Sequence, residues 1–350
     1  MAILKSKKYT VGSLYAGIGG ICLAFQKAGA EMKWANEFDA HACKTYRENF
    51  EHKLYEGDIH QLSPDQVEKV DIITSGFPCQ AFSIAGYRKG FQDERGLHFF
   101  QTMKFVDVLK PKAFLFENVK NLCSHDSGRT FERIQKEIMA RHYSFVPMIL
   151  NTREYGNVPQ TRERIYMVGF RDEAALGELD PNSATSYFLQ HKPAKQKLTV
   201  TIRELLESKV DEKYYYKRFP IYKFLKNEVK SRDTIYQWRR VYVRENKSNV
   251  CPTLTANMGT GGHNVPLILD TKGVRKLTPR ECARFQGFKD SDLKFPESMG
   301  DSHFYKQIGN SVSVPVVCRI AKVIIESLNH GNKKERSVSY KNNLTQKAPA

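Results

Sequence analysis

Hydrophobic and polar positions follow two alternating patterns between about residues 9 and 172. Apolar residues that recur every three or four positions predict helices over Ile21–Ala28, Phe99–Leu109 and Thr130–Arg141. Strand-length apolar runs come between these stretches, starting near Tyr9, Trp34, Asp71, Ala113, Ser144 and Arg164. Strands that alternate with helices are typical of a doubly wound sheet, so we predict an α/β fold with a mostly parallel sheet for residues 1–172.

The pattern changes after Asp172. Residues 213–247 hold eleven Lys or Arg, three Asp or Glu and nine aromatic residues, without strand–helix alternation. We therefore expect a smaller, irregular, basic domain over residues 173–275. Helical patterning returns over residues 276–330, which we expect to rejoin the first domain, with a long helix over Val312–Leu328. The polar residues 331–350 are predicted to be a disordered tail.

Composition narrows the class of protein. The net charge of +17 and the pI of about 9.4 favour a polyanionic partner, nucleic acid above all. No apolar run approaches the roughly 20 residues of a membrane span, and the charged start of the chain does not resemble a signal peptide. Seven cysteines without a C-x-x-C pair predict neither a disulfide framework nor a metal site, and they fit a reducing cytoplasm.

A glycine-rich turn, Ala16-Gly17-Ile18-Gly19-Gly20, lies between the first strand and the first helix. Glycine lets the backbone turn tightly and approach a ligand closely. Glu37 follows about 20 residues later, at the end of the next strand, where a carboxylate can accept hydrogen bonds from ribose hydroxyls. Asp58 comes one strand–helix unit further along the chain, where its carboxylate could contact the edge of an adenine ring. These residues predict an adenosine cofactor and leave NAD and S-adenosylmethionine both open.

Cys79 lies in the loop Ser75-Gly-Phe-Pro-Cys-Gln-Ala-Phe-Ser83, directly after a strand. The carboxyl ends of strands are where α/β enzymes place catalytic groups, and Pro78 stiffens this loop. Near a helix N-terminus or a cation, the Cys79 thiol would ionise more readily and become a nucleophile. The alternative is a buried packing cysteine, which is our interpretation of Cys22, Cys43 and Cys318.

Charged side chains accompany two further strands. Glu117 ends a strand of Phe and Leu, where desolvation favours a protonated carboxyl that can donate a hydrogen bond. Gln160, Arg162 and Arg164 alternate along extended chain and so share a face. Two guanidinium groups on one face suit a phosphate or a carbonyl oxygen.

In this order, these pieces resemble the cytosine-C5 methyltransferase family over residues 10–172 and 253–325. The resemblance rests on the turn at Tyr15–Gly20, Glu37, Asp58, Gly76-Phe-Pro-Cys-Gln, Asp93-Glu-Arg-Gly, Glu117-Asn-Val, Gln160-Thr-Arg-Glu-Arg, Arg275-Lys-Leu-Thr-Pro-Arg-Glu and Gln307-Ile-Gly-Asn-Ser-Val. Tyr15 departs from the phenylalanine that is usual in the first motif.

The resemblance implies S-adenosylmethionine as methyl donor and a cytosine flipped out of duplex DNA. Cys79 would attack C6, Glu117 would hold N3 and the 4-amino group, and Arg164 would bind O2. Arg162 would help to order Cys79 and the backbone. The implied cofactor contacts are Tyr15, Ala16, Gly17, Gly19, Gly20, Glu37, Phe38, Asp58, Ile59, Pro78 and Asn310.

The basic segment would be the family's target-recognition domain. Arg239, Arg240 and Arg244 are candidates for reading guanine or holding phosphate, and Gln80, Ser83 and Thr253 would contact DNA as well. Residues 237–266 look like family members that act on CCGG, CCNGG or CCWGG sites. The resemblance further implies a cytoplasmic, nucleoid-associated monomer, which a restriction endonuclease for the same site could accompany.

Three alternatives remain on the sequence. A tRNA cytosine methyltransferase is disfavoured by the basic segment of roughly 100 residues, since that branch usually has a smaller recognition region. A catalytically silent DNA-binding relative is disfavoured by intact Cys79, Glu117 and Arg164. A dehydrogenase is disfavoured by the glycine pattern, which departs from G-x-G-x-x-G.

Overall fold

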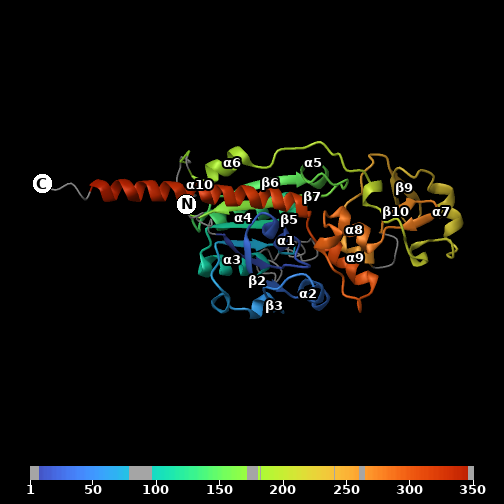
Figure 1. Cartoon of the computed structure of the whole chain (residues 1–350), viewed down its shortest axis with the longest axis horizontal. Helices are drawn as coiled ribbons and strands as arrows, with labels where there is room; N and C mark the ends of the chain where they lie inside the picture. The colour runs from blue at the N-terminus through green and yellow to red at the C-terminus, as the bar shows by residue number, and fades with distance from the viewer. Residues whose placement is uncertain are drawn as a thin grey trace, which may run out of the picture.

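The computed structural model describes residues 8–78, 97–171, 180–181, 183–239, 241–259 and 265–345, with backbone only for Leu97, Gly259 and residues 332–345. It has a larger lobe around a central sheet and a smaller lobe that holds β8, β9, β10 and α7 (Figure 1). The long helix α10 runs along the larger lobe (Figure 1).

The central sheet has seven strands in the order β3-β2-β1-β4-β5-β7-β6. The strands from β3 to β5 are parallel, whereas β7 is antiparallel to both of its neighbours. This arrangement confirms the predicted α/β fold with a mostly parallel sheet. The strands are β1 (Thr10–Leu14), β2 (Glu31–Glu37), β3 (Lys53–Glu56), β4 (Ile72–Ser75), β5 (Ala113–Val119), β6 (Val146–Asn151) and β7 (Glu163–Phe170).

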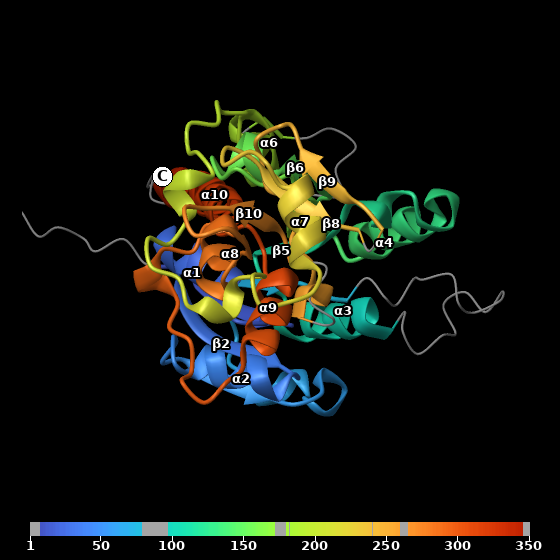
Figure 2. The ribbon, with the colours of Figure 1, turned by 90° about the vertical axis from the view of Figure 1, so that its right-hand side faces the viewer.

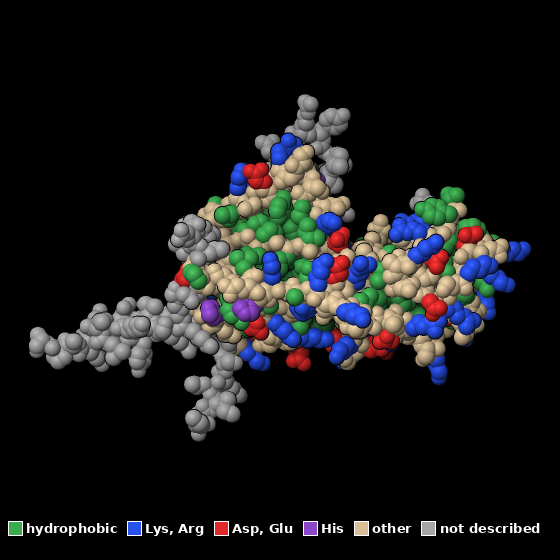
Figure 3. Space-filling view, turned by 90° about the horizontal axis from the view of Figure 1, so that it is seen from above, with side chains coloured by type: hydrophobic (Ala, Val, Ile, Leu, Met, Phe, Trp, Pro, Cys, Tyr) green, Lys and Arg blue, Asp and Glu red, His purple; other side chains and the backbone are tan. Residues whose placement is uncertain are grey.

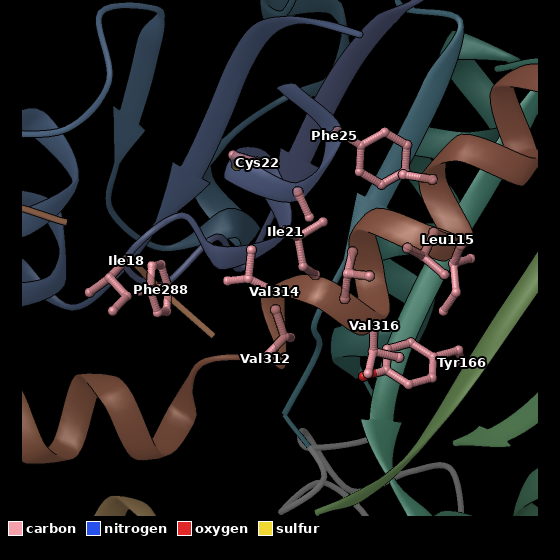
Figure 4. Close-up of a cluster of buried hydrophobic side chains, with 14 of the residues drawn as sticks. Ile18, Ile21, Cys22, Phe25, Leu115, Tyr166, Phe288, Val312, Val314 and Val316 are labelled. Atoms are coloured by element: carbon pink, nitrogen blue, oxygen red, sulfur yellow. The ribbon is translucent and has the colours of Figure 1, made fainter. Parts of the chain in front are cut away.

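Helices cover both faces of the central sheet. Along β5, Ala113 and Leu115 pack in one core and Phe114 and Phe116 in the other, as the two-residue period of a strand requires. The first core includes α1 (Gly20–Lys27), α2 (Ala40–Arg47), α6 (Ala184–His191) and α10 (Val314–Thr345). Figure 4 shows how Ile21 of α1 meets Val314 of α10 in this core. The second core includes α3 (Leu97–Leu109) and α4 (Arg129–Met139).

The smaller lobe has its own antiparallel sheet, in the order β11-β10-β8-β9. Its apolar core joins Leu225 to Tyr236 and Leu267. The elements are α7 (Tyr222–Glu228), β8 (Ile235–Trp238), β9 (Val243–Asn246), β10 (Leu267–Leu269) and β11 (Val274–Lys276). The short helices α8 (Pro279–Phe285) and α9 (Asp301–Asn310) lie between this lobe and the central sheet (Figures 1 and 2).

The C-terminal helix differs from the sequence prediction. We expected a disordered tail from Gly331, but α10 continues to Thr345. Residues 331–345 contain no proline, and the packed turns of α10 before them already supply the nucleus that helix growth needs. Low apolar content therefore predicts an exposed segment here, but it does not predict the loss of helical backbone.

In the described part of the chain, the helical segment Asp301–Gly331 contains a window that is long and apolar enough to cross a membrane, contrary to our expectation from the sequence. The most apolar window within it is 67% buried, and α10 packs on α1 and α6. This burial is what a core helix of the larger lobe requires.

The reversed direction of β7 matters for the site. Because β7 is antiparallel to β5, its first residues lie beside the last residues of β5, and Arg164 is in register with Val119. The amino end of β7 thus meets the carboxyl edge of the parallel strands. The polar residues at the start of β7 come to the same edge as Glu117.

Candidate active site

The glycine turn and Glu37 form one hydrogen-bonded unit. The Gly17 amide donates to Oε2 of Glu37 at 2.7 Å, and the Asp39 amide donates to Oε1 at 2.8 Å. Gly17 has φ 59° and Gly19 has φ 83°, values that favour glycine. A methyl group at position 17 would meet no other atom within 4 Å, so the described residues leave space beside the turn. Burial raises the pKa of the Glu37 carboxyl, against its backbone hydrogen bonds.

The other predicted cofactor residues surround this turn. Phe38 is 73% exposed, and a large aromatic ring in that state suits stacking on a flat ligand. Asp58 accepts hydrogen bonds from the His60 amide at 2.9 Å and from the His60 ring at 2.8 Å. These bonds, the backbone one first, lower the pKa of Asp58. Ile59 is buried in the second core, so only its backbone can face a ligand.

The C-terminal motif, residues 307–312, packs against the same glycine turn. A methyl group at position 20 would lie 2.6 Å from the Ser311 hydroxyl, so Gly20 is required by close contact. The Ser311 hydroxyl is buried and has no hydrogen-bond partner within the described part of the chain. Exposed Asn310 directly precedes it, at the end of α9. Ala16, whose amide donates to Asn36, is buried behind the turn.

Glu117 lies at the edge where β4 ends. A methyl group at position 76 would lie 4.0 Å from Oε2 of Glu117 and 3.7 Å from the Tyr15 carbonyl. The glycine turn, the Glu117 carboxyl and the segment that leads to Cys79 therefore lie close together around Gly76, with room for a methyl group between them. The buried Asn118 side chain donates to the Phe77 carbonyl at 2.9 Å and holds this segment against β5.

Arg164 pairs with Glu117, with 3.2 Å between Nε and Oε1. The Glu117 side chain is only 12% exposed. Burial raises the pKa of Glu117, while Arg164 and Arg162 oppose the rise. The pair presents a carboxyl and a guanidinium side by side, which can bind the donor and acceptor edge of a heterocyclic base.

Arg162 contacts the backbone of distant segments, and its implied role in ordering Cys79 stays a prediction. Its guanidinium is buried and donates to the carbonyls of Leu254, Gly309 and Ser311. Gln160 is also buried and joins the Leu254 amide to the Phe285 carbonyl. Both side chains therefore tie the start of β7 to the segment around Leu254, and Arg162 also ties it to Gly309 and Ser311. The prediction that they share a face with Arg164 stays a prediction.

Three of the six predicted DNA-binding residues, Arg239, Arg244 and Thr253, line a cleft of about 530 Å³. Arg239 and Arg244 line it from the β8–β9 hairpin, and Thr161 and Thr253 line it from the side of the larger lobe. The Thr253 hydroxyl donates to the Thr161 carbonyl at 2.6 Å, so it joins two segments of the cleft wall. Lys and Arg side chains are frequent on the lobe that carries this hairpin (Figure 3).

Four predicted residues, Cys79, Gln80, Ser83 and Arg240, lie outside the described residues, and Pro78 is the last described residue before them. Within the described ranges, no group of three or more His, Cys, Asp or Glu could hold a metal ion. Sequence reasoning also missed Asn118 and the positioning role of Gln160. A polar residue inside a strand of Phe and Leu is the signal that could have identified Asn118.

Comparison with known proteins identifies the class. The sequence model of the family "C-5 cytosine-specific DNA methylase" matches residues 9–326. The chain is 48% identical over 324 residues to "Type II methyltransferase M.Bsp6I" of Bacillus sp. (strain RFL6), with 91% of this chain and 99% of that protein covered. It is 38% identical over 331 residues to "Type II methyltransferase M.HhaI" of Haemophilus parahaemolyticus, with 90% and 94% covered.

Solved structures agree on the fold. S. pombe Dnmt2 methyltransferase matches with a TM-score of 0.69 at 20% identity, over 92% of this chain and all of that chain. A putative DNA modification methyltransferase encoded within an E. coli prophage matches with a TM-score of 0.68 at 22% identity and the same coverage.

Fold, site and relatives together define a methyltransferase, whose reaction requires a methyl donor and, here, DNA as the acceptor. The chain belongs to the C-5 cytosine-specific DNA methylase family. It is thus a DNA cytosine-5 methyltransferase, and the alternative of a dehydrogenase was wrong.

Proposed function

We propose that this enzyme transfers a methyl group from S-adenosylmethionine to C5 of a cytosine flipped out of duplex DNA, through a covalent bond between Cys79 and C6. One observation carries the proposal. The Glu117–Arg164 pair lies next to Gly76, three residues before Cys79, and the Tyr15 carbonyl beside Gly76 belongs to the glycine turn. A base-binding pair, the approach to a nucleophile and a cofactor turn therefore share one edge of the sheet.

The residues around the glycine turn fit an adenosine cofactor. Glu37 presents a buried carboxylate for ribose hydroxyls, and Phe38 presents an exposed ring for adenine. The open space at Gly17 and the Ser311 hydroxyl, which has no hydrogen-bond partner among the described residues, suit the methionine end. When bound there, S-adenosylmethionine supplies the methyl group on a positively charged sulfur.

The protein groups would then act on the cytosine in turn. The Cys79 thiolate would add to C6, and the electron pair that this addition places on C5 would form the bond to the methyl carbon as the bond from that carbon to the sulfur breaks, with S-adenosylhomocysteine as the leaving product. Glu117 donates to N3, and Arg164 donates to O2, so both stabilise the charge on the ring. Loss of the C5 proton to a base then lets the thiolate leave, which restores the aromatic ring and the free enzyme.

The smaller lobe would recognise the target sequence in the DNA. Arg239 and Arg244 line one cleft with polar side chains, which suits contacts to base edges and phosphates. The relatives named Type II methyltransferases support a role in restriction-modification, beside an endonuclease for the same site. We propose DNA rather than tRNA as substrate, and a monomer that acts on the nucleoid in the cytoplasm.

Trapping on fluorinated DNA tests the chemistry. Bisulfite sequencing of DNA from a host that expresses the protein first identifies the target site. A duplex with 5-fluorocytosine at that site should then form a covalent adduct that survives denaturation, because a proton can leave C5 as a cation and fluorine cannot. The adduct should require S-adenosylmethionine, since the stalled step follows methyl transfer.

Two cysteine variants provide the controls. Cys79→Ala should give no adduct and no methylation, while Cys318→Ala, on the partly buried face of α10, should trap normally. Methylation that survives in Cys79→Ala, or an adduct that maps to another cysteine, would contradict the mechanism. Adducts formed with fluorinated tRNA in preference to DNA would favour the tRNA alternative.

A further inference from the structure

The first turns of α3 contact three separate loops at the carboxyl edge of the central sheet. The Tyr15 hydroxyl, from the glycine turn, lies 3.0 Å from Nδ1 of His98 and donates to the His98 carbonyl at 3.2 Å. The buried Gln101 side chain donates to the Ile59 carbonyl at 3.0 Å. Thr102, also buried, shares a 3.0 Å hydroxyl contact with Ser75 at the end of β4.

The two contacts of the Tyr15 hydroxyl are compatible with each other. When Nδ1 of His98 carries the proton, the hydroxyl accepts from that N–H and donates its own hydrogen to the His98 carbonyl. The two rings meet edge to face, with centroids 5.5 Å apart and planes at 88°. Both ends of the Tyr15 side chain are therefore fixed, although the backbone of Tyr15 has the positive φ of 55° that non-glycine residues rarely adopt.

His98 also reaches the second acid of the cofactor site. Its ring lies 5.1 Å, between centroids, from the ring of His60, which in turn is hydrogen-bonded to Asp58. Burial lowers the pKa of His98 and so favours the neutral ring that the contact with Tyr15 uses. The His98 side chain thus contacts both Tyr15, which follows β1, and His60, which follows β3.

We propose that His98 is a positioning residue for the cofactor, which acts through the Tyr15 hydroxyl and through His60 and Asp58. A phenylalanine at position 15 would present the same ring without the hydroxyl, and it would lose both contacts to His98. The proposal rests on S-adenosylmethionine as the cofactor. It assigns to His98 no contact with the reacting atoms, so it predicts an effect on cofactor affinity rather than on the chemical step.

The experiment measures S-adenosylmethionine binding to the DNA-free enzyme by calorimetry, and methyl transfer to DNA at saturating cofactor. Tyr15→Phe should weaken binding about 5- to 13-fold, which corresponds to one hydrogen bond of about 1–1.5 kcal/mol, and its effect on cofactor affinity should exceed its effect on kcat. His98→Leu should also weaken binding, while His98→Asn should retain most of the affinity, because its amide occupies the place of Nδ1.

The double variant Tyr15→Phe/His98→Leu should lose less affinity than the sum of the two single losses, since both changes remove the same Tyr15–His98 contact and only the contact of His98 with His60 is lost in addition. Tyr143→Phe is the matched control, because the Tyr143 hydroxyl is buried and donates to the Pro111 carbonyl, far along the chain from the cofactor residues. It should lower stability without a change in cofactor affinity.

Three results would overturn the proposal. Unchanged cofactor affinity in both Tyr15→Phe and His98→Leu, with normal binding by the wild type, would refute the role of His98 and leave the proposed function intact. Additive losses in the double variant would show that the two residues act independently. A wild-type enzyme that binds no S-adenosylmethionine would refute the cofactor proposal together with this inference.

Discussion

Replacement of Glu37 by alanine is the most direct test of the cofactor site. The change deletes a carboxylate that accepts two backbone hydrogen bonds, from Gly17 and Asp39. Ionised acceptors make bonds of about 1.5–3 kcal/mol, so the loss of a comparable bond to ribose should weaken cofactor binding about 10- to 150-fold. The glycine turn also loses a support, and we expect the unfolding free energy to fall by at least about 1 kcal/mol.

Calorimetry with S-adenosylmethionine, in the absence of DNA, measures the affinity of the Glu37→Ala enzyme. Its affinity for duplex DNA should stay within about threefold of the wild type, because Glu37 lies outside the cleft lined by Arg239 and Arg244. Glu31→Ala is the matched control on the same strand, since Glu31 is exposed and pairs with Lys33. Cofactor affinity within twofold of the wild type in Glu37→Ala would refute the assignment of this carboxylate.

Two further predictions concern the DNA cleft and the buried carboxyl. Arg239→Ala or Arg244→Ala should relax the sequence preference at one base pair if that arginine reads a base. If the arginine holds phosphate instead, the variant should bind all DNA sites more weakly, and its affinity should depend less steeply on salt concentration. Binding assays on variants of the DNA site that detect neither change would disprove the cleft assignment. Burial raises the pKa of Glu117, so its contribution to stability is present below the ordinary carboxyl pKa of about 4.3 and is lost as the pH rises through the raised value. The melting temperature of the wild type, relative to Glu117→Gln, should therefore fall as the pH rises from 4 to 7, and a constant difference would contradict this sign.

The sequence predicts residues that follow consecutive strands better than residues that meet from distant segments. Glu37 and Asp58 are identified by their spacing because each follows a strand of a regular alternation. The partners of Arg162 are not identified in this way, since Leu254 and Ser311 lie 92 and 149 residues away along the chain. The packing of residues 256–259, which closely follow Leu254, on α9 brings these carbonyls to one guanidinium.

The direction of a strand is a second property that the hydrophobic periodicity of the sequence does not predict. The apolar run from Arg164 predicts a strand, but the same pattern would fit a parallel or an antiparallel neighbour of β5. The structure reverses β7, and this reversal brings Arg164 to Glu117. The motif order indicated that the two residues belong to one site, whereas their pairing required the topology.

The position of α10 has a consequence for the synthesis of this enzyme. Val314, Val316 and Ile320 of this helix complete a core against strands that are finished at Phe170. A ribosome must add roughly 150 further residues before that helix exists, which takes about 8–30 s at about 5–20 residues per second. During this interval the apolar face that α10 covers in the finished enzyme, beside α1 and α6, remains exposed. Newly made enzyme can therefore protect DNA only after nearly the whole chain has left the ribosome.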